Sequence, residues 1–169
     1  MLAIKIIIYI FIFLSCSLIG MLISKKYTNR VNELKDFKNA LNIFKTKIRY
    51  TYEPLPEIFE EISREMDSNI SSVFKLASEK MNLCSASDAW NLALKVENLN
   101  INEEDKGILN KLSKLLGRTD IDGQLSQIEM TSNFLDKQIF DAEKQKEKSQ
   151  KMYQTLGMII GIAIVIILV

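Results

Sequence analysis

The sequence predicts an all-α fold, in which an antiparallel bundle of about six helices lies between an N-terminal and a C-terminal transmembrane helix. Residues 2–23 hold one charge, Lys5, in 22 residues, and residues 152–169 hold none in 18. As helices these segments would span about 33 Å and about 27 Å, close to the roughly 30 Å hydrocarbon core of a bilayer. Between them apolar residues recur at helical spacing, and the chain has only two prolines and six glycines. We therefore divide the chain into a membrane helix at 1–24, a cytoplasmic helical domain at 25–151 and a membrane helix at 152–169.

Basic residues beside both apolar segments predict the membrane topology. Lys25, Lys26 and Arg30 follow the first segment. Four lysines precede the second: Lys144, Lys146, Lys148 and Lys151. Because basic residues near membrane spans stay on the cytoplasmic side, the middle of the chain is expected in the cytoplasm. The four lysines can also attract anionic lipid, at about 1 kcal/mol each, but topology determination is the simpler interpretation.

Two other interpretations of the N-terminal segment stay open. A cleaved signal peptide would need a small-residue cleavage site, whereas no A-x-A follows and Lys25-Lys26 resembles a stop-transfer flank. A lipoprotein site at Cys16 would need an aliphatic residue three positions earlier, where Phe13 stands. An uncleaved membrane helix fits better. Cys84 is expected to be a reduced cytosolic thiol.

The composition argues against several classes of function. The 128 residues at 24–151 carry 21 acidic and 21 basic residues, so they lack the basic excess of a nucleic-acid-binding domain. The chain has no histidine, which removes the commonest general base and metal ligand. No sequence motif for nucleotide binding, a nucleophilic serine or a redox pair occurs. We therefore expect no catalytic, cofactor-binding or metal-binding residues and no small-molecule substrate.

The first helix of the central domain is predicted to continue from the membrane segment. Its apolar residues step by three and four and form one stripe: Leu34, Phe37, Leu41, Phe44 and Ile48. The residue before a proline avoids the helical region, so this helix should end near Glu53, before Pro54. Pro56 can then open the next helix in its first turn. That helix points three residues inward: Ile58, Phe59 and Ile62.

Three shorter helices follow, separated by polar breaks at 67–69, 82–87 and 100–102. The first repeats Ile70, Val73, Phe74 and Ala77 at helical spacing. The second carries Ala89, Trp90, Leu92, Ala93 and Val96. The buried side of the third is predicted to be Ile108, Leu109, Leu112, Leu115 and Leu116.

Polar residues mark the ends of these short helices. Ser87 is the predicted N-cap of the second and Asn102 that of the third. The first turn of the third holds three favourably placed acidic residues: Glu103, Glu104 and Asp105. Gly117 is predicted to end it. Trp90 is expected in the core with its indole N–H satisfied locally.

The last helix is predicted to run without a break over 122–169, which is 48 residues and about 70 Å. A heptad seam follows its first part: Leu125, Ile128, Ser132, Leu135, Ile139 and Ala142. The helix turns polar at Lys146 and Ser149, yet no glycine or proline intervenes before Gly157. We interpret it as a core helix, a solvated stalk and a membrane anchor in one piece.

Gly157 and Gly161 form a G-x-x-x-G motif inside the last apolar segment. Glycines at this spacing let two membrane helices approach until their backbones touch. The motif therefore predicts a homo-oligomer contact or docking on another membrane helix, although glycine is also common in such helices. Gly20 in the first segment is an alternative partner within the chain.

An acidic face is predicted on the helix after Pro56. Glu57, Glu61 and Glu65 recur at every fourth residue, so they share one side. A catalytic or metal site would need converging ligands from a second element. An exposed acidic face is the simpler interpretation, and such a face can meet a basic partner.

Four short motifs occur in a distinctive order between the two apolar ends. Residues 48–55 read I-R-Y-T-Y-E-P-L, similar to I-x-Y-x-x-x-P-L, and Ala89-Trp90 stands in the middle. Residues 116–124 fit L-G-x-x-D-x-x-x-Q, and residues 151–161 lead into L-G-x-x-x-G. Together they resemble the stage III sporulation protein AB family over essentially the whole chain. Lys47 and Glu53 depart from the Glu and Thr that this family often has at these positions.

The resemblance implies a function that spacing alone does not show. Members of this family are similar to the cytoplasmic helical domains of the inner-membrane platform protein of type II secretion and type IV pilus machines. They belong to the channel complex that joins mother cell and forespore, and they lie in the mother-cell membrane around the forespore. The partners implied are a cytosolic secretion-type ATPase of the same sporulation set and other membrane proteins of the channel.

Our leading hypothesis is a non-enzymatic membrane adaptor that docks this ATPase and is required for endospore formation. The candidate contacts are Tyr50, Pro54, Leu55, Glu57, Glu61, Arg118, Asp120 and Gln124. For the turn at 50–55 and the loop at 118–124, helix punctuation is the simpler interpretation. The alternatives are a homodimeric membrane signalling module that transmits through its helical seams, and an enzyme acting at the membrane face.

Overall fold

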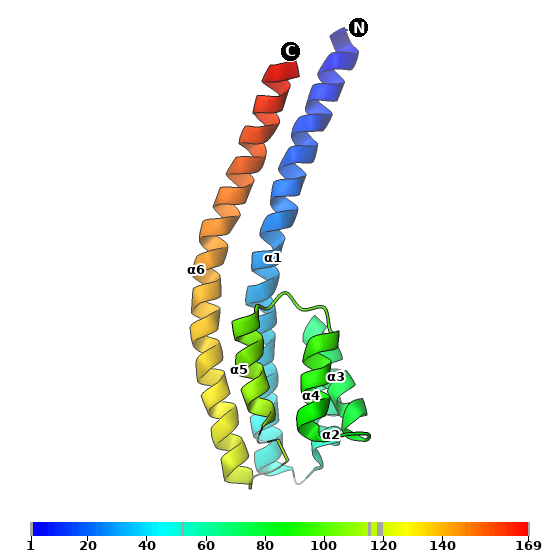
Figure 1. Cartoon of the computed structure of the whole chain (residues 1–169), viewed down its shortest axis with the longest axis vertical. Helices are drawn as coiled ribbons and strands as arrows, with labels where there is room; N and C mark the ends of the chain where they lie inside the picture. Colours follow the sequence, from blue (N-terminus) through cyan, green and yellow to red (C-terminus); the bar gives the residue numbers. More distant parts are fainter. Residues whose placement is uncertain (1, 52, 115, 118–119, 169) are drawn as a thin grey trace. The chain divides into compact units, whose positions relative to one another are not determined.

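The structure, a computed structural model, describes residues 2–168 except 52, 115, 118 and 119. Side chains are described from residue 9 onward, except those of 13 and 17. The described residues contain helices and no strand (Figure 1). The six helices are α1 (Leu2–Tyr50), α2 (Leu55–Glu65), α3 (Asn69–Met81), α4 (Ala86–Val96), α5 (Glu103–Ser113) and α6 (Ile121–Leu168). The predicted all-α fold is confirmed.

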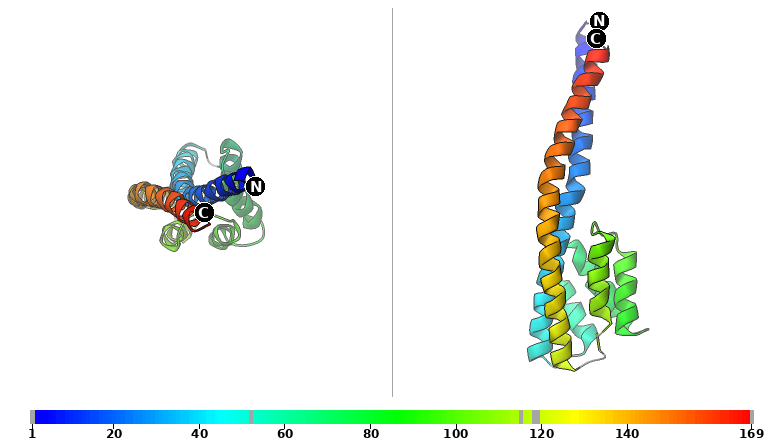
Figure 2. Two further views of the ribbon diagram at one scale, coloured as in Figure 1. Left: turned by 90° about the horizontal axis from the view of Figure 1, so that it is seen from above. Right: turned by 60° about the vertical axis from the view of Figure 1, so that its left-hand side comes forward.

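The chain forms two compact units. One, here called the terminal helix pair, consists of Met1–Val31 and Asp141–Val169, and the other, the central bundle, is Asn32–Phe140. Within the terminal helix pair the two segments run side by side and the chain ends lie at the same end (Figures 1 and 2). By length and composition, two of the described helical stretches can cross a membrane: Tyr9–Tyr50 and Ile121–Leu168.

Five aromatic rings form the centre of the central bundle. Phe37, Phe44, Phe59, Phe74 and Trp90 are all fully buried. Their ring centroids lie 5.1–6.4 Å apart in edge-to-face pairs, the geometry that aromatic quadrupoles favour. Because the rings come from α1, α2, α3 and α4, this cluster joins four helices into one core.

The indole of Trp90 joins a fifth helix to that core. Its Nε1 donates a 2.9 Å hydrogen bond to the carbonyl oxygen of Leu109, on α5. The predicted core position is therefore correct, but the partner lies 19 residues away rather than close in sequence.

The first predicted helix boundaries lie close to those found. α1 ends at Tyr50, three residues before Glu53, and Pro54 is the N-cap of α2. Pro56 stands in the first turn of α2, as predicted. Ile58, Phe59 and Ile62 are buried, which confirms the inward side of this helix.

Two caps of the short helices differ in outcome. Ser85, not Ser87, caps α4, because its extended backbone lets the hydroxyl accept a 3.2 Å hydrogen bond from the Asp88 N–H. Ser87 lies inside α4 and its hydroxyl donates to Ser113 Oγ at 3.3 Å. Asn102 caps α5 as predicted, and the buried Asp105 completes a reciprocal capping box.

Three details of α4 and α5 correct the sequence interpretation. Leu92 and Val96 are 40% and 64% exposed, so they lie outside the core, while Leu94 is buried. α5 ends at Ser113 with Lys114 as C-cap, so Gly117 does not end the helix but lies in the following loop. Leu115, predicted as buried, lies outside the described residues.

α6 is one helix of 48 residues, as expected. Most members of the predicted seam are buried: Leu125, Ile128, Leu135, Ile139 and Ala142. Ser132 is only half-buried, and its neighbour Thr131 is buried instead. Thr131 can occupy an inward position because its hydroxyl donates to the Gln127 carbonyl oxygen at 2.8 Å.

Candidate functional site: the loop end of the central bundle and the terminal helix pair

Two loops that are far apart in sequence meet at one end of the central bundle. A Cβ placed on Gly117 would lie 3.3 Å from Leu55 Cδ1, so the α1–α2 turn packs against the α5–α6 loop. The end of α1, the start of α2, the end of α5 and the start of α6 lie at this end of the central bundle (Figure 1 and the right-hand view of Figure 2). Gly117 has φ +68°, a backbone conformation that glycine adopts readily and other residues do not. We call this surface the loop end.

The loop end gathers several residues that the sequence singled out. Tyr50 is 72% exposed and Pro54 is exposed, while Leu55 is half-buried against Gly117. Asp120 is exposed, and its Oδ1 accepts a 3.0 Å hydrogen bond from the Gly123 N–H at the start of α6. Gln124 is half-buried one turn further on. Arg118 lies outside the described residues.

The acidic face of α2 is partly neutralised. Lys47 on α1 forms an ion pair with Glu61 and lies 3.8 Å from Glu65. The hydrogen bond to Glu61 raises the pKa of Lys47 above its usual range. Glu57 is exposed and forms no ion pair within the described part of the chain. Glu57 is therefore the member of this face that is available to another molecule.

Sequence reasoning missed two carboxylates that hold the central bundle together. The Glu33 side chain is buried on α1, where its two oxygens accept 2.6 Å hydrogen bonds from the N–H and the side-chain amide of Asn100. This clamp fixes the loop between α4 and α5 onto α1. Glu104 accepts a 2.9 Å hydrogen bond from Gln138 and joins α5 to α6. Neither contact has a signal in sequence spacing, because the partners come together only in the fold.

Backbones touch inside the terminal helix pair. A Cβ added to Gly20 would lie 2.6 Å from the Tyr153 carbonyl oxygen and 3.4 Å from Gly157 Cα. Gly157 and Gly161 are both buried. Gly157 therefore packs on Gly20 of the same chain, which is the intrachain alternative to a contact between copies. The homo-oligomer through Gly157 and Gly161 stays a prediction.

Aromatic and polar contacts support the same pairing of helices. The rings of Tyr27 and Tyr153 stack with their centroids 6.0 Å apart. Arg30 Nη1 donates a 2.9 Å hydrogen bond to Gln145 Oε1. The Arg30–Gln145 contact lies outside both apolar segments, where polar side chains can meet water, while Tyr153 stands at the start of the second apolar segment.

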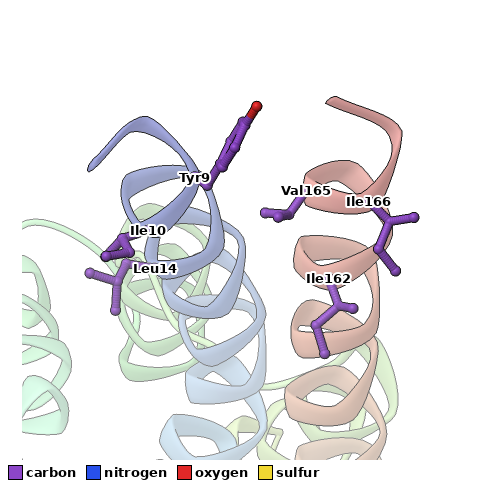
Figure 3. Close-up of a pocket in the computed structure, with 6 residues that line it drawn as sticks. All are labelled: Tyr9, Ile10, Leu14, Ile162, Val165 and Ile166. Carbon is purple, nitrogen blue, oxygen red and sulfur yellow. The ribbon is translucent and has the colours of Figure 1, made fainter. Parts of the chain in front are cut away.

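The apolar ends of the pair enclose a shallow pocket. Its lining is aliphatic apart from one tyrosine (Figure 3): Tyr9, Ile10, Leu14, Ile162, Val165 and Ile166. The Tyr9 hydroxyl donates a 2.9 Å hydrogen bond to the Leu168 carbonyl oxygen, which the end of a helix leaves without an intrahelical partner. Such a lining suits acyl chains and offers no group for chemistry.

Across the described residues, no group of three or more Cys, Asp or Glu side chains is placed to hold a metal ion. The two sites described above, the loop end and the glycine contact of the helix pair, are packing and recognition features. The fold and these sites define an all-α protein with two candidate membrane spans and a polar helical bundle.

Comparison with known proteins gives the family. The model of the stage III sporulation protein AB family matches residues 5–169, and the chain belongs to this family, which acts in sporulation. A stage III sporulation protein AB of Bacillus subtilis (strain 168) is 25% identical over 163 residues, which cover 94% of this chain and 95% of the relative. A solved structure of a stage III sporulation protein AB (SpoIIIAB) has a similar fold, with a TM-score of 0.66 at 22% identity; the match covers 71% of this chain and 98% of that one.

Proposed function

We propose that this protein is a non-enzymatic membrane adaptor of the sporulation channel between mother cell and forespore, and that its loop end docks a cytosolic secretion-type ATPase. Membership of the stage III sporulation protein AB family supports a role in sporulation. The contact between Leu55 and Gly117 supports the docking surface, because it unites two separate segments with exposed polar and aromatic groups. The central bundle lies in the cytoplasm, where such an ATPase is found, and the spans lie in the mother-cell membrane around the forespore.

A surface of this kind suits a contact that must be specific and reversible. Tyr50 offers a large exposed ring, of the type enriched in interface hot spots. Glu57 and Asp120 add exposed negative charge, which a basic patch on the ATPase would complement. The rigid packing of Leu55 on Gly117 holds these groups without further ordering on binding.

The direct test is the affinity of full-length protein in detergent micelles for the purified ATPase. Glu57→Lys and Asp120→Lys should each weaken binding by about tenfold or more. Glu61→Lys alone breaks the ion pair between Lys47 on α1 and Glu61 on α2, whereas Glu61→Lys combined with Lys47→Glu forms an ion pair of reversed polarity. Comparison of the two variants therefore separates an effect on the packing of α1 against α2 from an effect on ATPase binding. Glu79→Lys, an equal charge change on the exposed side of α3, is the matched control and should bind normally.

Three results would contradict the proposal. The first is that the full-length wild-type protein does not bind the ATPase, which would remove the docking role. Equal weakening by Glu79→Lys and Glu57→Lys would show a general charge effect and no docking at the loop end. In the cell, deletion of the gene should block sporulation after engulfment, and normal spore yield in the deletion strain would count against the proposal.

A further inference from the structure

We propose that one face of α5 and α6 binds an acidic amphipathic helix of a partner protein. The face, here called the α5–α6 face, consists of Gly107, Lys111, Lys114, Met130, Phe134 and Lys137. It shares no residue with the loop end, and the proposal does not depend on the docking of an ATPase there.

Two contacts hold α5 and α6 side by side around this face. Gln138 Nε2 donates a 2.9 Å hydrogen bond to Glu104, and Lys111 Nζ lies 5.9 Å from the centre of the Phe134 ring. Residue numbers rise on one helix as they fall on the other, so the two helices are antiparallel. Gly107 stands between these two contacts along α5.

No feature of the described part of the chain requires glycine at position 107. It lies in the interior of α5, it does not have a positive φ, and a Cβ there would meet nothing within 4 Å. Glycine in a helix interior is unfavourable relative to alanine, because it gains no packing and loses more conformational entropy. The missing side chain leaves room for another backbone to approach α5 closely.

Apolar side chains flank this open position. Phe134 is 46% exposed and Met130 is 50% exposed. They lie four residues apart on α6, so they share one side of the helix. Exposed aromatic and methionine side chains are typical of surfaces that bind amphipathic helices.

Positive charge surrounds the apolar residues. Lys111 and Lys114 are exposed on the same side of α5 as Gly107, at spacings of four and seven residues, and Lys137 continues the Met130 and Phe134 side of α6. In the part of the chain that the structure describes, none of the three lysines forms a salt bridge. Of the acidic residues beside this face, Glu104 accepts a hydrogen bond from Gln138 and Glu103 pairs with Lys106, while the exposed Asp141 follows Lys137 by one turn. Three lysines therefore stand against one exposed carboxylate that is not engaged by either of these contacts. The charge of this face therefore selects an acidic partner.

The best occupant is a helix with an apolar stripe between acidic flanks. Its stripe would cover Phe134 and Met130, its backbone would approach at Gly107, and its carboxylates would meet the lysines. A second copy of this chain fits less well. Its acidic helix α2 keeps its apolar residues buried, so α2 offers no exposed stripe to cover Phe134.

The test uses full-length protein in nanodiscs of uncharged phosphatidylcholine and two fluorescein-labelled helical peptides. Both peptides carry leucine at helical spacing; one has glutamate and the other lysine at the flanking positions. Fluorescence anisotropy gives the affinities, with empty nanodiscs subtracted. The affinity of the acidic peptide should exceed that of the basic peptide by about tenfold or more, and added salt should weaken binding of the acidic peptide.

Variants then locate the contact. Lys111→Glu and Gly107→Gln should each weaken the acidic peptide by about tenfold. Gly107→Gln keeps a good helix former in α5, so the protein should fold at least as stably as wild type while it binds less well. Lys95→Glu, the same change on the exposed side of α4, is the control and should leave binding unchanged.

Three outcomes would overturn the proposal. The first is no binding of the acidic peptide, or equal binding of both peptides. The second is normal binding by Lys111→Glu or Gly107→Gln. The third is a cross-link between two copies of this chain from a photoreactive residue at position 137, because that would make a second copy the occupant.

Discussion

Leu55 packs directly against Gly117, 62 residues later in the chain, and this contact closes one end of the central bundle. The two residues come from a turn rich in proline and from a loop that needs a left-handed backbone at φ +68°. Each loop alone can be explained by the need to end one helix and begin the next. Their contact turns two separate loops into one continuous surface.

Replacement of Gly117 by alanine should destabilise the central bundle by about 1–2 kcal/mol, because an L-residue disfavours the left-handed region. The new Cβ would also crowd Leu55 at 3.3 Å. Urea unfolding of full-length protein in detergent, followed by the emission of Trp90, the only tryptophan, measures the change. Gly107→Ala is the matched control and should stabilise by about 1 kcal/mol, since it lies in a helix with open space around it. The same sign for both variants would contradict this account.

Replacement of Gly20 by isoleucine should separate the terminal helix pair. The added Cβ alone would lie 2.6 Å from the Tyr153 carbonyl oxygen, which is backbone and cannot rotate away. Photo-oxidation that couples stacked tyrosines should give a dityrosine signal from Tyr27 and Tyr153 in wild type, and this signal should fall in the variant.

Two further variants calibrate that signal. Leu22→Ile changes an exposed residue of the same helix and should keep the dityrosine yield. Tyr27→Phe should abolish it. A normal yield from Gly20→Ile would mean that the glycine contact does not hold the pair together, and the motif at Gly157 and Gly161 would then be free for a homo-oligomer.

Replacement of Trp90 by phenylalanine should lower the free energy of unfolding by about 1–3 kcal/mol, through the lost hydrogen bond and the space left behind. The loss follows from the 2.9 Å bond to the Leu109 carbonyl oxygen and from full burial of the indole. Circular dichroism during urea unfolding measures it. Tyr50→Phe, at an exposed ring, should change stability by less than about 0.5 kcal/mol. Equal effects would show that the core does not depend on the indole.

The pH dependence of stability should show the effect of the raised pKa of the Asp36 carboxyl. Burial raises the pKa of this carboxyl, and a hydrogen bond with the Ser68 side chain offsets part of the effect. A raised pKa in the folded state means that folding takes up a proton, so Asp36 disfavours folding above its folded pKa and this penalty disappears as the pH falls toward the unfolded value. Asp36→Asn should therefore stabilise the protein at pH 7 and have little effect near pH 3.5. A larger gain in stability near pH 3.5 than at pH 7 would contradict a raised pKa for Asp36.

The sequence predicted the elements well where the signal is local. The apolar stripe of α1, the first turn of α2 and the cap at Asn102 depend on residues close in the chain. The prediction of Ser87 as a cap was wrong, because α4 begins at Ala86, so that Ser87 lies inside the helix and Ser85 precedes it. Only the backbone shows which serine hydroxyl reaches an unpaired N–H.

Long-range contacts were beyond the sequence. Nothing in its spacing links Glu33 to Asn100, or Leu55 to Gly117, since such pairs form only when helices pack. Gly20 was named as a partner for Gly157, but one sequence could not choose between that contact and a second copy. For the loop end, exposure of Tyr50, Pro54 and Asp120 agrees with a contact surface, while binding there stays a prediction.

The central claim is that the helical bundle faces the cytoplasm while both chain ends cross the membrane. Cys84 tests it directly, because its thiol is exposed on the bundle, whereas Cys16 lies in the first apolar segment. A membrane-impermeant maleimide should leave Cys84 unlabelled in growing, non-sporulating cells that produce the protein in their outer cell membrane and are stripped of their wall. It should label Cys84 after permeabilisation, with Cys84→Ser as the background. Labelling of Cys84 in the intact cells would place the bundle outside the cytoplasm and contradict the account.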